Sequence, residues 1–300
     1  MNPVQEAPVL AAADSRSALA AVTGAVTALF VPGNRPERFA KAAASAADVV
    51  IIDLEDAVAA GDKAAARQEA VAALSGVRGS GLRAIVRPNA RGTAEYDGDV
   101  QALLDLAFQP AHGLLGVMVP KAEDPEHLAG LAAKLPQDVP LVALVETALG
   151  LVNAVELARV PGVARLAFGA IDFALDIDAD GGDRFLDHTR SQLVVASRAA
   201  GIAAPLDSPA TAIRDTAPVA ESARLGRAFG FGGKLCIHPA QLTAVKEAYA
   251  PSAEQIEWAR RVLAAEGGAA QVDGQMVDRP VTDRARRILE RAGLEPNEQD

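Results

Sequence analysis

The sequence predicts an α/β protein built as a (β/α)8 TIM barrel with a small C-terminal helical lid segment. Short apolar runs recur eight times along the chain, at intervals that leave room for a helix between them. Most of the intervening segments are rich in alanine and carry apolar residues at helical spacing. Alternating strands and helices predict a parallel sheet with right-handed crossovers, and eight such units match a closed barrel. A doubly wound open sheet has the same alternation and is the alternative.

The expected strands are continuous apolar runs, which is the pattern of parallel strands that are buried on both faces. They span residues 27–31, 49–54, 83–87, 116–120, 141–145, 165–170, 201–206 and 234–237. The helices expected between them include residues 36–47, 63–74, 126–135, 150–159 and 189–200. We therefore expect the barrel to occupy residues 25–250.

Both ends of the chain lie outside the expected barrel. Residues 1–24 are interpreted as an N-terminal tail or short helix, because acidic residues precede the first arginine, unlike in a secretory signal peptide. Residues 251–300 are interpreted as a C-terminal helix and lid. Ser252 is a preferred N-cap for a helix that runs to about residue 266, and a last helix is expected over residues 282–292. This segment is too small to fold alone, so we expect it to form a lid or to pack on a neighbouring subunit.

The bulk composition excludes several classes of protein. The net charge is −10 and no basic stripe stands out, which argues against nucleic acid as the main partner. No apolar run reaches the ~18 residues that a membrane helix needs, so no membrane partner is expected. Cys236 is the only cysteine, which excludes an intrachain disulfide and makes a cytoplasmic location the expectation.

Two carboxylates at the ends of neighbouring expected strands are the most informative feature of the sequence. The apolar runs at 141–145 and 165–170 lead to Glu146 and Asp172. An α/β barrel places its chemistry at the carboxyl ends of its strands. Two hard oxygen ligands there suit Mg2+, which fills its remaining positions with water and substrate oxygens. The pair therefore predicts a metal-assisted reaction on a small anion.

Other polar residues follow the remaining apolar runs, where charges are costly unless they are paired or bound to metal. They are Asn34, Asp53, Glu55, Asp56, Arg87, Lys121, Asp207 and His238. The Arg87 guanidinium suits bidentate binding of a substrate carboxylate or an ion pair with Asp53 or Glu55, and both interpretations can hold together. Asp56 and Asp207 are equally interpretable as members of a salt bridge that closes the barrel end or as helix N-caps.

Several motifs make the chain similar to the citrate lyase β-subunit family, which belongs to the HpcH/HpaI aldolase/citrate lyase superfamily and includes malyl-CoA and citramalyl-CoA lyases. They are L-F-V-P-G at 29–33, D-L-E-D-A-V at 53–58, V-R at 86–87, P-K at 120–121, V-E-T at 145–147, F-G-A-I-D at 168–172, G-G-K at 232–234, I-H-P-A-Q at 237–241 and M-V-D-R-P at 276–280. The similarity covers about residues 28–290 in the order and spacing of the family.

The resemblance implies a TIM barrel that cleaves or forms a C–C bond between an acyl thioester and a 2-oxo acid. The family's Mg2+ ligands fall on Glu146 and Asp172, and the arginine that binds the substrate carboxylate falls on Arg87. The resemblance also implies substrate contacts at Glu146, Gly169 and Ala170, and contacts to CoA or an acyl carrier near Phe30, Lys41, Ile237 and His238. Asp278 matches an acid/base that reaches the neighbouring subunit's site, which implies a homo-oligomer and, in this family, a trimer.

Two positions depart from the family pattern. Val26 and Thr27 stand where the family usually has an Arg-Ser pair, and Glu37 stands where a basic residue is common. Both differences concern the binding of CoA and leave the metal residues unchanged. Without the resemblance, Asp278 is interpretable as a turn residue before Pro280.

The expected function is Mg2+-dependent cleavage or formation of a 3-hydroxy-acyl thioester such as malyl-CoA, citramalyl-CoA or a citryl thioester. Glu55 and Asp56 are expected to orient waters around the metal, and Arg87 and Asp278 to act on the substrate. The alternatives are a CoA-independent metal aldolase of 4-hydroxy-2-oxo acids, a malyl-type thioesterase, and a non-catalytic dicarboxylate-binding or complex subunit. An acid/base at Asp278 argues against the last, because a binding module does not need one.

Overall fold

Eight parallel strands form a closed barrel in the computed structural model, which describes residues 17–76, 81–180, 183–265 and 271–295. The strands are β1 Thr27–Pro32, β2 Val49–Asp53, β3 Ala84–Arg87, β4 Leu114–Val119, β5 Leu141–Val145, β6 Val163–Phe168, β7 Ala203–Asp207 and β8 Gly233–Cys236. They pair in chain order, and β8 closes on β1, where Thr27 is aligned with Lys234. The predicted barrel is confirmed, and the open-sheet alternative is wrong.

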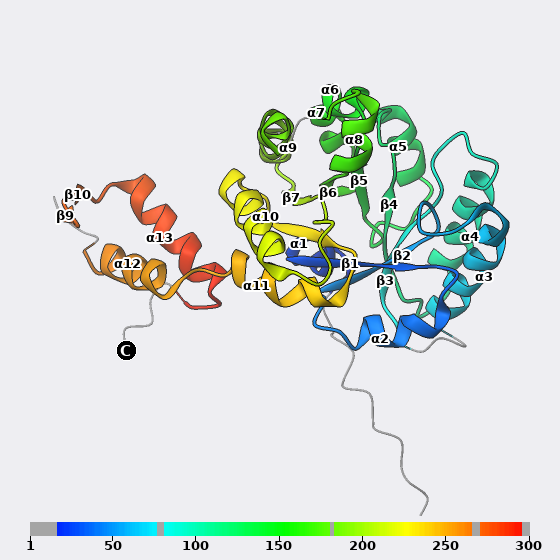
Figure 1. The fold of residues 1–300 in the computed structure, drawn as a ribbon, viewed down its shortest axis with the longest axis horizontal. Coiled ribbons are helices and arrows are strands. Elements are labelled where there is room, and N and C mark those ends of the chain that lie inside the picture. The colour runs from blue at the N-terminus through cyan, green and yellow to red at the C-terminus, as the bar shows by residue number, and fades with distance from the viewer. Residues whose placement is uncertain (1–16, 77–80, 181–182, 266–270, 296–300) are drawn as a thin grey trace, which may run out of the picture. The chain divides into compact units, whose positions relative to one another are not determined.

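Helices surround the strands of the barrel (Figure 1). They are α2 Phe39–Ala43, α3 Lys63–Leu74, α4 Tyr96–Ala107, α5 Pro125–Ala132, α6 Ala148–Val152, α7 Ala154–Arg159, α8 Ala170–Asp176, α9 Leu186–Ala200, α10 Thr216–Phe229 and α11 Leu242–Tyr249. The helix predicted over 36–47 is instead a 3-10 turn, Pro36–Arg38, followed by the short α2. The helix predicted over 150–159 is divided at Asn153 into α6 and α7. No helix in the described ranges is long and apolar enough to cross a membrane.

The amino ends of the strands are covered by α1, Ala18–Gly24. Val22 and Ala25 belong to the same buried cluster as inward side chains of the strands, such as Ile51. The fully buried Arg165 of β6 donates hydrogen bonds to the carbonyl oxygens of Val22 (3.1 Å) and Ala25 (2.6 Å). A cation stabilises the carbonyl groups that a helix leaves unpaired at its C-terminus. The interior of the barrel is therefore filled at its amino end by α1 and Arg165.

The register of the strands sets which residues meet at the carboxyl end. Pro32 is aligned with Asp53, and Asp53 with Arg87. On the opposite wall, Val145 is aligned with Phe168, so that the residues directly after β5 and β6 lie next to each other.

A separate unit, Lys246–Asp300, follows the first unit, Met1–Val245. It contains α12 Ala253–Ala264, the short antiparallel strands β9 Gln271–Val272 and β10 Gln275–Met276, and α13 Arg279–Arg291. Ser252 caps α12 in a capping box with Gln255, which confirms its predicted role. The last helix begins at Arg279, earlier than predicted, because the Asp278 carboxylate accepts the Val281 N–H and caps it.

Candidate active site

A pocket of about 500 Å3 opens at the carboxyl ends of the strands. Its lining comes from almost the whole circumference of the barrel and consists of Phe30, Pro32, Asp53, Asp56, Ala57, Arg87, Leu144, Glu146, Gly169, Ile171, Asp172, Ser208, Pro209, Leu235 and Ile237. Apolar side chains therefore form most of the wall, and charged groups gather on the side of β2, β3, β5 and α8. Such a site, mostly apolar with a few convergent charges, is typical of a small-molecule pocket.

Asp53 holds Arg87 in one orientation. Arg87 donates from Nε to Asp53 Oδ1 (2.8 Å) and from Nη2 to Asp53 Oδ2 (2.7 Å). The same two oxygens accept the backbone N–H groups of Glu55 and Ala57. Both side chains are buried, so the pair is shielded from water. The predicted ion pair of Arg87 is confirmed, and its guanidinium also lines the pocket, as the substrate-binding role requires.

Two more carboxylates lie beside Arg87. Its Nη1 is 3.1 Å from Glu55 Oε2 and 3.3 Å from Asp56 Oδ2. The contact with Glu55 is an electrostatic one without the alignment of a hydrogen bond. Loss of solvation, together with nearby Glu146, Asp56 and Asp53, raises the pKa of Glu55 to about 8, although Arg87 opposes the rise. The Phe30 ring covers the other side of the guanidinium, with its centroid 4.9 Å from Arg87 Cζ.

A polar network behind these residues was missed by the sequence interpretation. Lys63 of α3 donates from Nζ to the carbonyl oxygens of Leu54 (3.1 Å) and Glu55 (2.9 Å), and also to the Asn89 side chain. Asn89 in turn binds the buried Asp99 of α4. The network ties the loop after β2 to the loop after β3, and so fixes Glu55 relative to Arg87. One feature of the sequence could have revealed this network: Asp99 stands on a face of α4 that is otherwise apolar.

Glu146, directly after β5, is a buried residue of the pocket lining. Its Oε1 accepts the Lys121 N–H (2.7 Å), and Lys121 has a φ of +46°, which is uncommon for a residue other than glycine. Loss of solvation raises the pKa of Glu146 to about 7; Asp172 and Asp56 add to the rise, while the Lys121 amide and Arg87 oppose it. Gly169 packs directly against this side chain.

Asp172 was predicted to lie at the end of a strand, and this prediction is wrong. Strand β6 stops at Phe168, Gly169 occupies the N-cap position, and Asp172 lies in the first turn of α8. The run 165–170 was misread because its last residues, Gly169 and Ala170, continue the apolar pattern into the helix. Asp172 is half-buried and still lines the pocket, so the two predicted carboxylates do lie at one site.

A divalent cation fits this pair. Burial of Glu146 beside a second carboxylate is unfavourable unless a proton or a cation compensates the charge. No group of three or more His, Cys, Asp or Glu side chains with metal-binding geometry occurs in the described part of the chain. The protein thus offers two hard oxygen ligands and leaves the other positions to water and substrate, which is the preference of Mg2+.

Asp207 was wrongly placed among the pocket residues. Side chains alternate along a strand, and Leu206 belongs to the cluster inside the barrel, so Asp207 points outward. There its Oδ2 accepts from Lys234 Nζ (2.6 Å), and both side chains are fully buried. Asp207 is the last residue of β7 and does not cap a helix. Its ion pair with Lys234 links β7 to β8.

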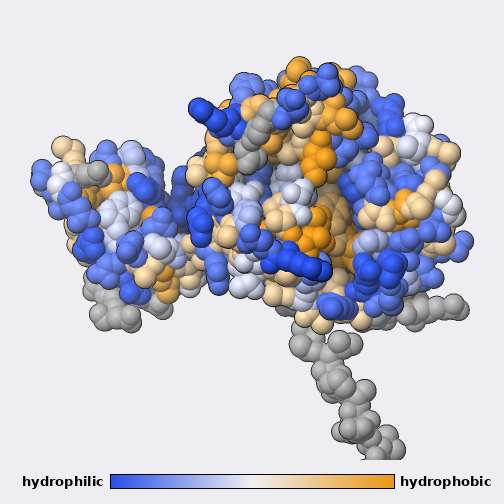
Figure 2. Space-filling view, viewed as in Figure 1, coloured by the Kyte–Doolittle hydropathy of each residue, from blue (hydrophilic) through white to orange (hydrophobic). Residues whose placement is uncertain are grey.

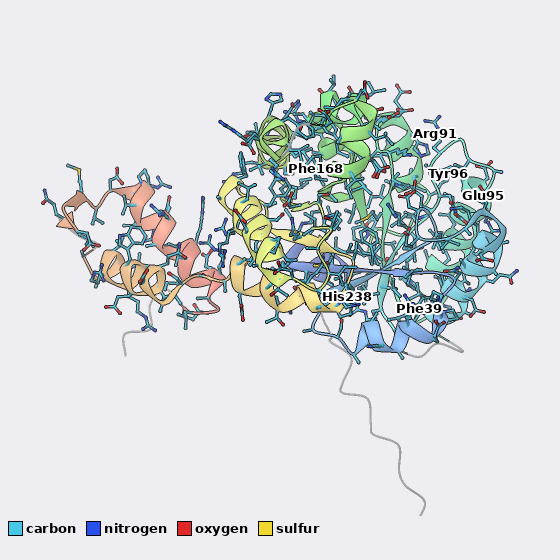
Figure 3. All side chains as sticks on the ribbon, viewed as in Figure 1. Phe39, Arg91, Glu95, Tyr96, Phe168 and His238 are labelled. Atoms are coloured by element: carbon cyan, nitrogen blue, oxygen red, sulfur yellow. The ribbon has the colours of Figure 1, made fainter. Side chains whose placement is uncertain are left out.

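The four residues predicted near CoA have different positions. Phe30 and Ile237 line the pocket. Lys41 is exposed on α2, outside the pocket lining. His238, which Figure 3 labels, is exposed after β8, where its Nδ1 accepts the Ala240 N–H and caps the 3-10 helix Pro239–Gln241. Asp278 belongs to the second unit and is exposed.

Apolar side chains gather on the surface over α6 and α8 (Figure 2). They are Leu149, Val152, Ile171 and Leu175, which are between 54% and 80% exposed. Ile171 also lines the pocket, so this surface begins at the mouth of the site.

Comparisons with known proteins agree with the geometry. A family model described as HpcH/HpaI aldolase/citrate lyase matches residues 27–239, and one described as a C–C bond lyase of the TIM-barrel fold matches residues 199–294. A citrate lyase subunit beta-like protein of Mycobacterium tuberculosis is 45% identical over 275 residues, which cover 88% of this chain and 94% of that protein. The human mitochondrial citramalyl-CoA lyase is 32% identical, over 87% of this chain and 83% of its own length.

Solved structures give the same result. The crystal structure of CitE from Mycobacterium tuberculosis in complex with magnesium, acetoacetate and coenzyme A has a TM-score of 0.78 and 41% identity, and it covers 91% of this chain and 99% of its own. The citrate lyase beta subunit of M. tuberculosis complexed with oxaloacetate and magnesium has a TM-score of 0.66 and 37% identity, with 77% and 100% coverage.

Proposed function

We propose that this chain, which belongs to the HpcH/HpaI aldolase/citrate lyase family of C–C lyases, is a Mg2+-dependent lyase of a 3-hydroxy-acyl thioester. Substrates of this class are malyl-CoA, citramalyl-CoA and citryl thioesters, and the products are an acyl thioester and a 2-oxo acid. The observation that carries the proposal is the buried Glu146 beside Asp172, in one pocket with a guanidinium held by Asp53. This arrangement suits an anion whose carboxylate end is bound both by a cation and by Arg87.

Glu146 and Asp172 would hold the Mg2+, which supplies Lewis-acid chemistry and a template for the carboxylate and the adjacent oxygen of the acid. Arg87 binds the same part of the substrate and stabilises charge that develops on its oxygen. In the direction of cleavage a base removes the hydroxyl proton, and the C–C bond then breaks to give the 2-oxo acid and the enolate of the thioester. Glu55 and Asp56 orient water beside the carboxylate pair.

Asp278 of a neighbouring subunit is proposed to exchange the proton at the thioester carbon. Its Oδ1 accepts the Val281 N–H at the start of α13, and among the described residues nothing engages Oδ2. The cap thus fixes the carboxylate and leaves one oxygen for chemistry. This role requires a homo-oligomer, which we propose to be a trimer in the cytoplasm. The exposed apolar residues over α6 and α8 support a subunit contact near the pocket.

The test is an assay of C–C cleavage with malyl-CoA and citramalyl-CoA, in Mg2+ and in EDTA. We expect glyoxylate or pyruvate to form only in the presence of Mg2+. Glu146→Ala should lower turnover by about 10³-fold or more, since Mg2+ loses a ligand and the 2-oxo acid loses the metal that binds it. Glu156→Ala is the matched control. It removes the same kind of side chain from an exposed position on α7, outside the pocket lining. Intact Mg2+-dependent turnover in Glu146→Ala would refute the proposal. Release of free CoA without C–C cleavage would instead favour a thioesterase, the activity named for a Cereibacter sphaeroides relative at 33% identity.

The pKa of Glu146 predicts a pH dependence of metal binding. Its pKa is about 7 in the folded protein, against an ordinary glutamate value of 4.5, so the folded state keeps a proton that the unfolded state has lost. The stability of the metal-free protein therefore falls as the pH rises from about 4.5 to about 7. Mg2+ competes with this proton, so the rise in melting temperature caused by Mg2+ should grow as the pH passes 7. Differential scanning fluorimetry between about pH 5.5 and 8.5 measures it. An equal shift at both ends of the range would contradict the prediction, and Glu146→Gln should abolish the trend.

A further inference from the structure

Ser208 is a pocket residue whose hydroxyl hydrogen meets no acceptor in the part of the chain that the structure describes. It follows β7, is 5% exposed and lines the pocket. Its Oγ accepts the backbone N–H of Ala170 at 3.1 Å. A serine hydroxyl can also donate one hydrogen bond, and no acceptor for it occurs among the described residues. The donor is therefore available to a molecule in the pocket.

The chain on both sides of Ser208 is fixed. The preceding Asp207 is fully buried in its ion pair with Lys234. On the other side, Gln241 Nε2 donates to the carbonyl oxygens of Ala210 and Ala212, each at 2.8 Å. The hydroxyl is thus placed by its surroundings before any ligand binds, which is the condition for an effective binding group.

The environment of Ser208 indicates what it binds. Ala170, its hydrogen-bond partner, begins the helix turn that contains Asp172. Among the side chains that line the pocket, Ser208 is the only one that is both polar and uncharged. An ionised carboxylate can only accept hydrogen bonds, and Arg87 already faces the carboxyl groups of Asp53, Glu55 and Asp56. Ser208 therefore offers an anionic substrate a neutral hydrogen-bond donor on the side of Asp172.

We propose that Ser208 is a substrate-binding residue that donates its hydroxyl hydrogen to the carboxylate of the 2-oxo acid. The inference rests on the proposed function, since it takes a 2-oxo acid as the ligand. It also changes the expected role of Ala170, because its amide reaches the substrate through the serine oxygen rather than directly. The Ala170 N–H polarises the hydroxyl and strengthens its donation.

Isothermal titration of the full-length protein with pyruvate and with oxaloacetate, at saturating Mg2+, tests the proposal. Ser208→Ala should weaken the binding of both acids by about tenfold or more, because a hydrogen bond to a charged group is lost. Its affinity for Mg2+ alone should stay unchanged, and its melting temperature should fall by only a small amount, because the Ala170 N–H loses its acceptor. Ser208→Thr, which keeps the hydroxyl, should retain most of the affinity. Ser191→Ala is the matched control, since Ser191 is exposed and bonds only to the Asp187 carbonyl in its own helix.

The outcomes separate this inference from the proposed function. Wild-type binding of the acids together with unchanged binding by Ser208→Ala overturns the role of Ser208 and leaves the lyase proposal standing. An equal loss of Mg2+ affinity and acid affinity in Ser208→Ala also overturns it, because the serine would then only support the pocket wall. Failure of the wild-type protein to bind either acid in Mg2+ would overturn both.

Discussion

Replacement of Asp53 by asparagine is expected to destabilise the protein by about 3–5 kcal/mol, because it leaves a buried guanidinium without its principal counter-charge. Each carboxylate oxygen of Asp53 accepts two hydrogen bonds, one from Arg87 and one from a backbone N–H. An asparagine NH2 group would face two of these donors. Urea denaturation, followed by circular dichroism, measures the change in the free energy of unfolding.

The same substitution should also lower Mg2+-dependent turnover by about 100-fold, since a small displacement of a substrate-binding group has an effect of this size. Asp62→Asn is the matched control. Asp62 is exposed and accepts only from Asn34 Nδ2 in the described structure, so its change in stability should stay within about 0.5 kcal/mol. A similar small change in Asp53→Asn would show that Glu55 and Asp56 are sufficient to hold Arg87.

Gly169→Ala is expected to lower Mg2+-dependent turnover by about 100-fold while the protein remains folded. A Cβ atom at Gly169 would lie 2.6 Å from Glu146 Oε2 and 2.7 Å from Glu146 Cβ. The backbone cannot retreat easily, because the Gly169 N–H donates to the Val145 carbonyl. The methyl group therefore displaces the Glu146 carboxylate. Steady-state kinetics over a range of Mg2+ concentrations should show a weaker apparent affinity for the metal.

Gly130→Ala provides the comparison for this substitution. Gly130 lies within α5, and a Cβ atom there meets nothing within 4 Å. Gly130→Ala should leave turnover unchanged and raise the free energy of unfolding by up to about 1 kcal/mol, because alanine is favoured over glycine in a helix. Equal turnover in Gly169→Ala and Gly130→Ala would mean that Glu146 tolerates displacement and is not a metal ligand.

The sequence was sufficient to predict the barrel, because eight apolar runs recur along it and segments with helical spacing separate most of them. It also brought Arg87, Glu146 and Asp172 together, since each follows or adjoins an apolar run. What it could not provide was the direction of a side chain at a strand end. Asp53 and Asp207 both close such a run, yet one points into the barrel and the other outward, because a shift of one residue reverses the face.

Interactions between distant segments were equally beyond prediction. Lys63 looked like an ordinary residue at the start of a helix, and only the fold brings its ammonium group to two carbonyls and Asn89. Ser208 gave no signal either, because its partner Ala170 is 38 positions away and contributes only a backbone amide. Such contacts depend on three-dimensional packing, which a single sequence does not reveal.

The bond between Arg165 and α1 has a consequence for how the molecule folds. Arg165 binds carbonyl groups that lie 143 and 140 positions earlier in the chain. Because closing so long a loop has an entropic cost, we expect the first helix to dock only once β6 has joined the barrel. A fluorescent label near Ser17 would therefore report a late step of folding, the closure of the amino end of the barrel.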